Sequence, residues 1–276
     1  MIRYSGLLRL LILASLLLTV GCGRYFSKED PMETLPVESM YQEAKTSIQN
    51  GNYSRATRYY RRLIARFPYG PYTEQAQLEL AYAQYKTRDN EEAMSAVNRF
   101  IKTYPTNPHI DYAYYLRGLI NFVRRDTFLG SYVKLDLTQR DQSSIEQSFN
   151  DFAELLRRYP NSRYAADTRQ RMVFLRNQMA RYEMNVAEYY VRRDAWVAAA
   201  NRGKYIVEHY PQSEYIPDAL AIMALSYDHL GQEQLSADAR RVLQLNDPQH
   251  PYLASKHWPR SSGWWKRLIP LAGDRR

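Results

Sequence analysis

The chain has 276 residues, of which 45% are hydrophobic, and a formal net charge of +9 at pH 7. Its single cysteine, Cys22, excludes a disulfide within the chain and any metal site that needs several cysteines. Arg3 and Arg9 lie in an N-terminal leader, and residues 256–276 hold six Lys and Arg against one acidic residue. The body between them is close to neutral, so the sequence does not predict nucleic-acid binding by this body.

Residues 1–21 have the pattern of a signal peptide, with a basic start and an apolar run over residues 10–20. That run is too short for a membrane-spanning helix, which needs about 20 apolar residues. Residues 18–22, LTVGC, are similar to a bacterial lipobox, although threonine stands where leucine is usual. The similarity predicts cleavage before Cys22, its acylation and, because Gly23 is not Asp, residence in the outer membrane. The alternative is an ordinary signal peptide and an unmodified cysteine.

Five prolines, each preceded by an aromatic residue or Asp, divide the rest of the chain. A proline cannot donate the next helical hydrogen bond and disfavours helix in the residue before it, so each pair is expected to end a helix. Repeating units of about 34–40 residues with helix–turn–helix content are typical of a tetratricopeptide solenoid. We therefore predict an all-α solenoid of about five helix pairs. The pairs are Phe67-Pro68, Tyr104-Pro105, Tyr159-Pro160, Tyr210-Pro211 and Asp247-Pro248, and midway turn residues are expected at Gly51, Asp89, Asp194 and Gly231.

The proline intervals are irregular in two places. The third repeat contains an insertion, from Thr127 to Ser143, and an extra helix from Arg163 to Arg181 is expected to bridge the two halves. The predicted parts are a leader (1–21), a lipidated tether (22–36), repeats one to three (37–160), the bridging helix with repeats four and five (161–248), and a basic Trp-rich tail (249–276).

Several motifs make the prediction more specific. They are RFPYGPY at 66–72, HIDYAYYLRGL at 109–119, YPNSRY at 159–164, VAEYY at 186–190 and AWVA at 195–198. Together with the lipobox and the interrupted third repeat, they resemble the BamD family, lipoproteins of the outer-membrane β-barrel assembly machinery. The resemblance runs from about Pro36 to Pro248 and does not include the tail.

The resemblance implies a non-enzymatic scaffold, anchored in the outer membrane and facing the periplasm. It also implies binding of the barrel-forming subunit BamA through its periplasmic domains, of the lipoprotein BamC, and of unfolded outer-membrane proteins. A different lipoprotein of the same fold, such as a pilotin that escorts a secretin, is the alternative. An enzyme such as a cell-wall lyase would need a separate catalytic domain, for which the repeats leave no room.

Aromatic residues on the first helix of each repeat are candidates for a groove that binds extended peptides, because they offer a large contact area and a polar hydroxyl. The alternative for each tyrosine is packing between helices, and the sequence leaves both open. The candidates are Tyr41, Tyr82, Tyr85, Tyr112, Tyr115 and Phe122.

Charged residues suggest where a partner could dock. Asp136 and Arg140 lie in the insertion, where the resemblance favours an ordered loop that takes part in docking. The resemblance places the BamA contact in the C-terminal half, where Arg202 is the candidate for an ion pair across the interface. A face that is merely solvated is the alternative.

The tail places Trp264, Trp265, Leu268 and Ile269 on one helical face. Such a short amphipathic segment suits a membrane interface, or a cap on the last repeat or a partner contact. A cap or a partner contact is favoured because the segment is only two turns long. Elsewhere, the five histidines have no metal-ligand spacing, and no nucleotide or nucleophile motif is found. The sequence predicts no catalytic residue, metal or cofactor.

Overall fold

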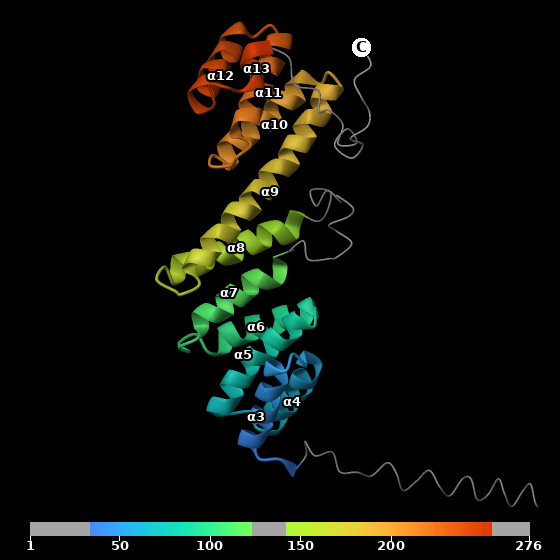
Figure 1. Cartoon of the computed structure of the whole chain (residues 1–276), viewed down its shortest axis with the longest axis vertical. Coiled ribbons are helices and arrows are strands. Elements are labelled where there is room, and N and C mark those ends of the chain that lie inside the picture. The colour runs from blue at the N-terminus through green and yellow to red at the C-terminus, as the bar shows by residue number, and fades with distance from the viewer. Residues whose placement is uncertain (1–33, 123–141, 256–276) are drawn as a thin grey trace, which may run out of the picture. The chain divides into compact units, whose positions relative to one another are not determined.

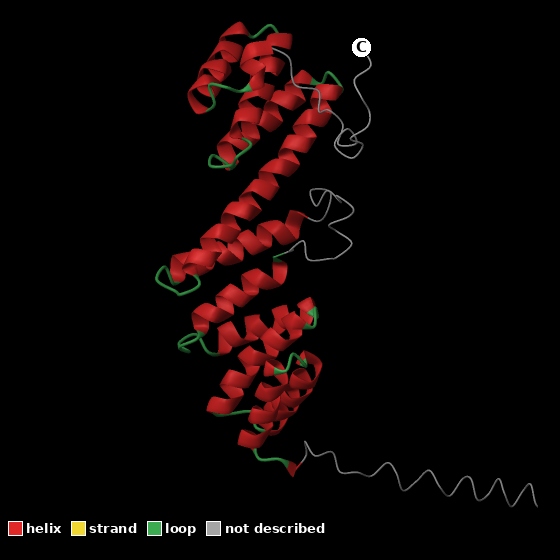
Figure 2. Ribbon diagram, in the orientation of Figure 1, coloured by secondary structure: helices red, strands yellow, loops and turns green. Residues whose placement is uncertain are grey.

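The computed structural model describes residues 34–122 and 142–255, and these residues are helical and contain no strand (Figures 1 and 2). The predictions for Cys22, for Asp136 and Arg140, for most of the tether and for the Trp-rich segment lie outside the described residues.

Five pairs of consecutive helices and one short final helix make up the described chain (Figure 1). The first four helices are α3 (Val37–Gln49), α4 (Tyr53–Arg66), α5 (Pro71–Lys86) and α6 (Asn90–Thr103). They are followed by α7 (Ile110–Asn121), α8 (Gln142–Arg158) and α9 (Ala165–Arg192). The last four are α10 (Trp196–His209), α11 (Ile216–His229), α12 (Glu233–Asn246) and α13 (Pro251–Ser255).

Each proline pair ends a helix as predicted. The second helix of every repeat stops one residue before the aromatic or Asp residue that precedes the proline, at Arg66, Thr103, Arg158, His209 and Asn246. The all-α tetratricopeptide fold with five helix pairs is therefore confirmed.

Two compact units make up the chain, Met1–Ala96 and Val97–Arg276, and each has its own core. The core of the first unit is built on α3, α4 and α5, with Met40, Tyr60 and Leu63 fully buried. The predicted division after residue 160 stays a prediction.

The second unit has one core cluster between α9, α10 and α11, around Met184, Ile206 and Ile222. A further cluster joins α11, α12 and α13 around Leu243 and the fully buried Tyr252. The short helix α13 therefore covers the end of the last repeat, within the segment that the sequence assigned to the tail.

The predicted bridging helix continues without a break into the first helix of the fourth repeat. Together they form α9, which is 28 residues long, begins at Ala165 and does not end at Arg181. The segment contains neither proline nor glycine, the residues that most often end a helix. The helix packs against α8, α10 and α11.

The turns between paired helices use a left-handed residue. Gly51 and Gly231 have φ of 72° and 69°, and Asp194 has φ of 56°. In the second repeat the left-handed residue is Arg88, with φ of 66°, one position before the predicted Asp89. Asp89 instead accepts a hydrogen bond from the Thr87 hydroxyl at 2.7 Å.

Two glycines allow neighbouring helices to approach closely. A Cβ on Gly118 of α7 would overlap the ring of Phe152 on α8. A Cβ on Gly203 of α10 would lie 2.8 Å from the carbonyl oxygen of Ala219 on α11. These contacts fix the helix pairs on which the candidate surfaces lie.

Candidate functional site

In the first unit, Tyr41 lies in the core. Its side chain is buried, and its hydroxyl donates to Glu79 at 2.9 Å, while the Tyr60 hydroxyl donates to the other oxygen of the same carboxylate. Burial and the charge of Glu79 raise the pKa of both phenols. The Tyr41 side chain is therefore engaged in packing in this structure.

Tyr82 and Tyr85 lie on α5 and are partly exposed. The Tyr82 ring meets the edge of Tyr53 with 6.1 Å between centroids, and burial followed by the contact with Tyr53 raises the Tyr82 pKa. The Lys86 ammonium lies 5.3 Å from the Tyr53 ring. These three rings and the cation present a mixed aromatic and basic surface on the first unit.

In the second unit, the three other predicted aromatic residues meet two aromatic residues that the prediction missed. We call this set, Tyr112, Tyr115, Phe122, Tyr164 and Phe174, the aromatic cluster. Tyr115 and Tyr164 stack with centroids 4.6 Å apart and planes 13° apart. Phe122 lies 5.7 Å from Phe174, whose side chain is 40% exposed. The cluster joins α7 and the residue after it to the first half of α9 and the residue before it.

An ion pair holds the aromatic cluster in place. The Arg171 guanidinium lies 4.7 Å from the centroid of Phe122 and donates to Asp167 at 2.5 Å. The Tyr115 hydroxyl donates to the same carboxylate at 2.6 Å. Burial, then the hydrogen bond to Asp167, raises the pKa of Tyr115 to about 12. The phenol is therefore a neutral donor at physiological pH.

Sequence reasoning missed Tyr164, Asp167, Arg171 and Phe174 as site residues. Tyr164 belongs to the motif YPNSRY, and Asp167 and Arg171 have the i, i+4 spacing of a helical ion pair. That spacing was the signal in the sequence from which the ion pair of Asp167 and Arg171 could have been predicted. Nothing in the sequence indicated that this pair would face α7.

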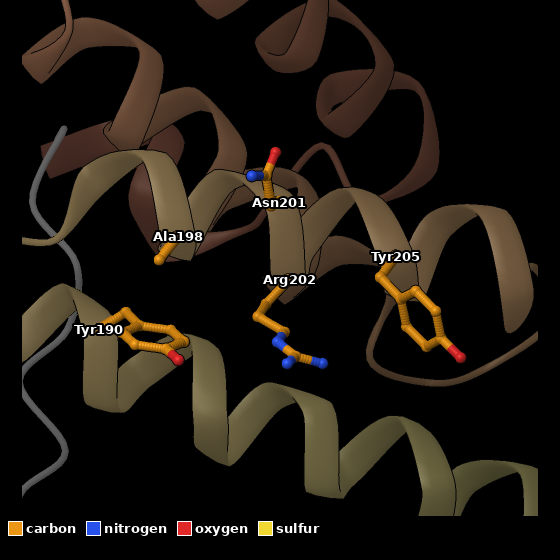
Figure 3. Close-up of a pocket in the computed structure, with 5 residues that line it drawn as sticks. All are labelled: Tyr190, Ala198, Asn201, Arg202 and Tyr205. Atoms are coloured by element: carbon orange, nitrogen blue, oxygen red, sulfur yellow. The ribbon is translucent and has the colours of Figure 1, made fainter.

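Another candidate surface of the second unit is a pocket between α9 and α10, with a volume of about 350 Å³. It is lined by Tyr190, Ala198, Asn201, Arg202 and Tyr205. The Arg202 side chain points toward α9, between Tyr190 and Tyr205 (Figure 3).

Arg202 is already paired within the chain. Its Nη1 lies 2.7 Å from Oε2 of Glu183 on α9, whose side chain is 8% exposed, whereas that of Arg202 is 41% exposed. The Tyr205 ring on the same side of α10 stacks on His209 at 3.9 Å. The pocket thus combines a half-exposed guanidinium with aromatic walls.

The described residues hold no group of three or more His, Cys, Asp or Glu side chains placed to bind a metal ion. Among the helices described, none is both long and apolar enough to cross a bilayer.

The described chain has five helix pairs, small residues where helices touch, and partly exposed aromatic surfaces. These features define a tetratricopeptide-repeat protein. The family YfiO, described as "Outer membrane lipoprotein", matches residues 33–243. The chain therefore belongs to the YfiO/BamD family of outer membrane lipoproteins, as its motifs predicted.

Two relatives illustrate the similarity. The chain is 48% identical to "Outer membrane protein assembly factor BamD" of Xylella fastidiosa (strain Temecula1), over 96% of this chain and 90% of the relative. It is 42% identical to the protein of the same name from Neisseria meningitidis serogroup A, over 83% and 86%. Among solved structures, a thermophilic tetratricopeptide protein of Thermus thermophilus matches at TM-score 0.35 and 14% identity, covering 80% of this chain and 96% of that one.

Proposed function

We propose that this protein is an assembly factor for outer-membrane proteins. It acts as a non-enzymatic scaffold, anchored through lipidated Cys22 to the periplasmic face of the outer membrane. It docks the periplasmic domains of BamA, binds BamC and receives unfolded outer-membrane proteins. The observation that carries this proposal is the 48% identity to a protein of that name over 96% of the chain.

The aromatic cluster is the proposed contact for unfolded substrate. Strands of outer-membrane barrels alternate apolar and polar residues and carry aromatic residues at both membrane interfaces. Partly exposed rings, held by Asp167 and Arg171, offer faces for such side chains at little entropic cost. Tyr82 and Tyr85 offer a similar surface on the first unit.

The pocket at Arg202 is the proposed docking point for BamA. A partner carboxylate can pair with a guanidinium bidentately, in competition with Glu183, while Tyr190 and Tyr205 supply aromatic contact. The ion pair with Glu183 keeps the guanidinium at the pocket before a partner arrives.

Photocrosslinking in cells tests both surfaces. We expect p-benzoylphenylalanine in place of Phe174 to capture unfolded outer-membrane proteins, and in place of Tyr205 to capture BamA. Arg169 and Lys204 are exposed, about 140° around α9 from Phe174 and about 100° around α10 from Tyr205, and are the matched control positions. Capture of only secretin subunits or cell-wall proteins at Phe174 and Tyr205, or equal capture at the controls, would overturn the proposal.

A further inference from the structure

The last long helix, α12, exposes a line of apolar side chains. Leu235, Val242 and Leu245 are 46%, 39% and 79% exposed. Spacings of seven and three residues place them on one side of the helix. We call these three residues the α12 stripe.

The α12 stripe is separate from the surface with which α12 packs. The helix buries Ser236, Ala239 and Leu243, which face α11 and α13, and the Ser236 hydroxyl donates to the carbonyl of Ala224 at 3.0 Å. The stripe lies on another side of the helix, so packing against α11 or α13 does not explain why these three exposed residues are apolar.

The described chain ends beside this helix. His250 lies 3.1 Å from Asp218 near the start of α11, and the Tyr252 hydroxyl donates to Asp228 near its end at 3.3 Å. His250 and Tyr252 therefore contact α11 near both of its ends. The Arg240 guanidinium of α12 lies 5.9 Å from the Tyr252 ring, so α13 touches both helices.

The chain beyond Ser255 has the length and composition to cover the stripe. Trp264 is nine residues along the chain from Ser255, with eight residues between them, a reach of about 30 Å when extended. Helix α12 has 14 residues, a length of about 21 Å, so its whole length is within reach. Trp264, Trp265, Leu268 and Ile269 supply the complementary apolar face.

We propose that the segment 264–269 docks on the α12 stripe and extends the cap that α13 begins. Attachment through a short linker gives an effective concentration of the order of millimolar, which suits a small contact. A stripe of three side chains falls far short of the roughly 800 Å² per partner that a stable interface between two chains buries. The tethered segment is therefore the occupant we expect, rather than a second copy.

The charges on α12 and on the tail also favour docking of segment 264–269 on the α12 stripe. Asp238 lies on the same side of α12 as the stripe and is bonded to Arg241 at 2.9 Å. Lys266 and Arg267 of the tail lie between Trp265 and Leu268 in the sequence and carry the opposite charge. Docking would bring these cations close to the Asp238 carboxylate.

The test places p-benzoylphenylalanine at position 245 of the purified full-length lipoprotein in detergent. After irradiation, mass spectrometry identifies the crosslinked peptides. We expect crosslinks within one chain to the peptide that contains residues 264–269. Gln244 is exposed and lies about 100° around the helix from Leu245, so the same probe at position 244 is the matched control.

Substitution of the tail sharpens the test. In the variant Trp264→Ser/Trp265→Ser/Leu268→Ser, the crosslink from position 245 should be lost, while the circular dichroism of the repeats stays unchanged. The proposal is wrong if position 245 captures a second chain, detergent-solubilised phospholipid or no peptide. It is also wrong if position 244 captures the tail as efficiently.

Discussion

At the scale of single residues, one carboxylate organises the core of the first unit. Glu79 on α5 accepts hydrogen bonds from Tyr41 of α3 and Tyr60 of α4, and its neighbour Gln75 donates to it at 2.9 Å. Two of these donors are buried phenols, with Tyr41 7% exposed and Tyr60 fully buried. A single acidic side chain therefore ties three helices together.

Replacing Glu79 by alanine should destabilise the protein strongly. Each of the two buried hydroxyls left without an acceptor costs about 1–3 kcal/mol, so Glu79→Ala should lower the free energy of unfolding by roughly 2–6 kcal/mol. Glu79→Gln keeps an acceptor oxygen and should cost less. Urea denaturation followed by circular dichroism measures both, and equal stability of the alanine variant and the parent would contradict this role.

The Tyr115 phenol should make stability depend on alkaline pH. Its pKa in the folded protein is about 12, above the value near 10 of an unfolded chain. Between these values the folded state holds a proton that the unfolded state has lost, so stability falls as pH rises. The contribution is complete below pH 10 and is lost by about pH 12.

Comparison with Tyr115→Phe isolates this contribution from those of other tyrosines. The difference in unfolding free energy between parent and variant should shrink as pH rises through the same window. A difference that stays constant from neutral to alkaline pH would show that the Tyr115 phenol does not titrate as the bond to Asp167 requires.

At the scale of elements, the helix ends follow from local chemistry and were predictable. Proline pairs fixed the end of the second helix in all five repeats, because the effect of proline needs no tertiary contact. The turn in the second repeat was placed one residue late. Thr87, Arg88 and Asp89 contain no glycine to mark the left-handed position, so the sequence did not distinguish them.

That turn offers a stabilising substitution. A left-handed conformation costs a residue with a Cβ roughly 1–2 kcal/mol, and glycine avoids this cost. Arg88→Gly should therefore raise the thermal midpoint and the free energy of unfolding, by about 1 kcal/mol after the extra entropy of the unfolded glycine. Arg88→Ala, which keeps the Cβ, is the control and should bring no gain.

At the scale of the whole chain, the sequence located the family and three of the five residues of the aromatic cluster. Tyr112 and Tyr115 lie on α7 and Phe122 directly follows it, and the three were found because they recur at helical spacing. Their partners Tyr164, Asp167 and Arg171 belong to a helix some fifty residues later, and periodicity along one segment carries no information on such pairing. Arg202 was selected, but its bond to Glu183 was not foreseen for the same reason.

The continuity of α9 gives a prediction at this scale. Gln178 is partly exposed midway between the aromatic cluster and the pocket. Gln178→Pro should cost about 3 kcal/mol or more, because proline breaks an interior helical bond. Gln178→Gly keeps that bond and should cost only about 1 kcal/mol. Thermal unfolding of the two variants checks the difference, and equal costs would indicate that α9 already bends there.

Because α9 is one uninterrupted helix, it fixes the distance between the aromatic cluster and the pocket. Arg171, which holds the aromatic cluster in place, and Tyr190 of the pocket are nineteen residues apart on it, a distance of about 28 Å along the axis. An extended peptide covers that distance with about nine residues. A membrane-spanning strand of a barrel has about 9–11 residues. The spacing between the two surfaces therefore equals the length of a single barrel strand.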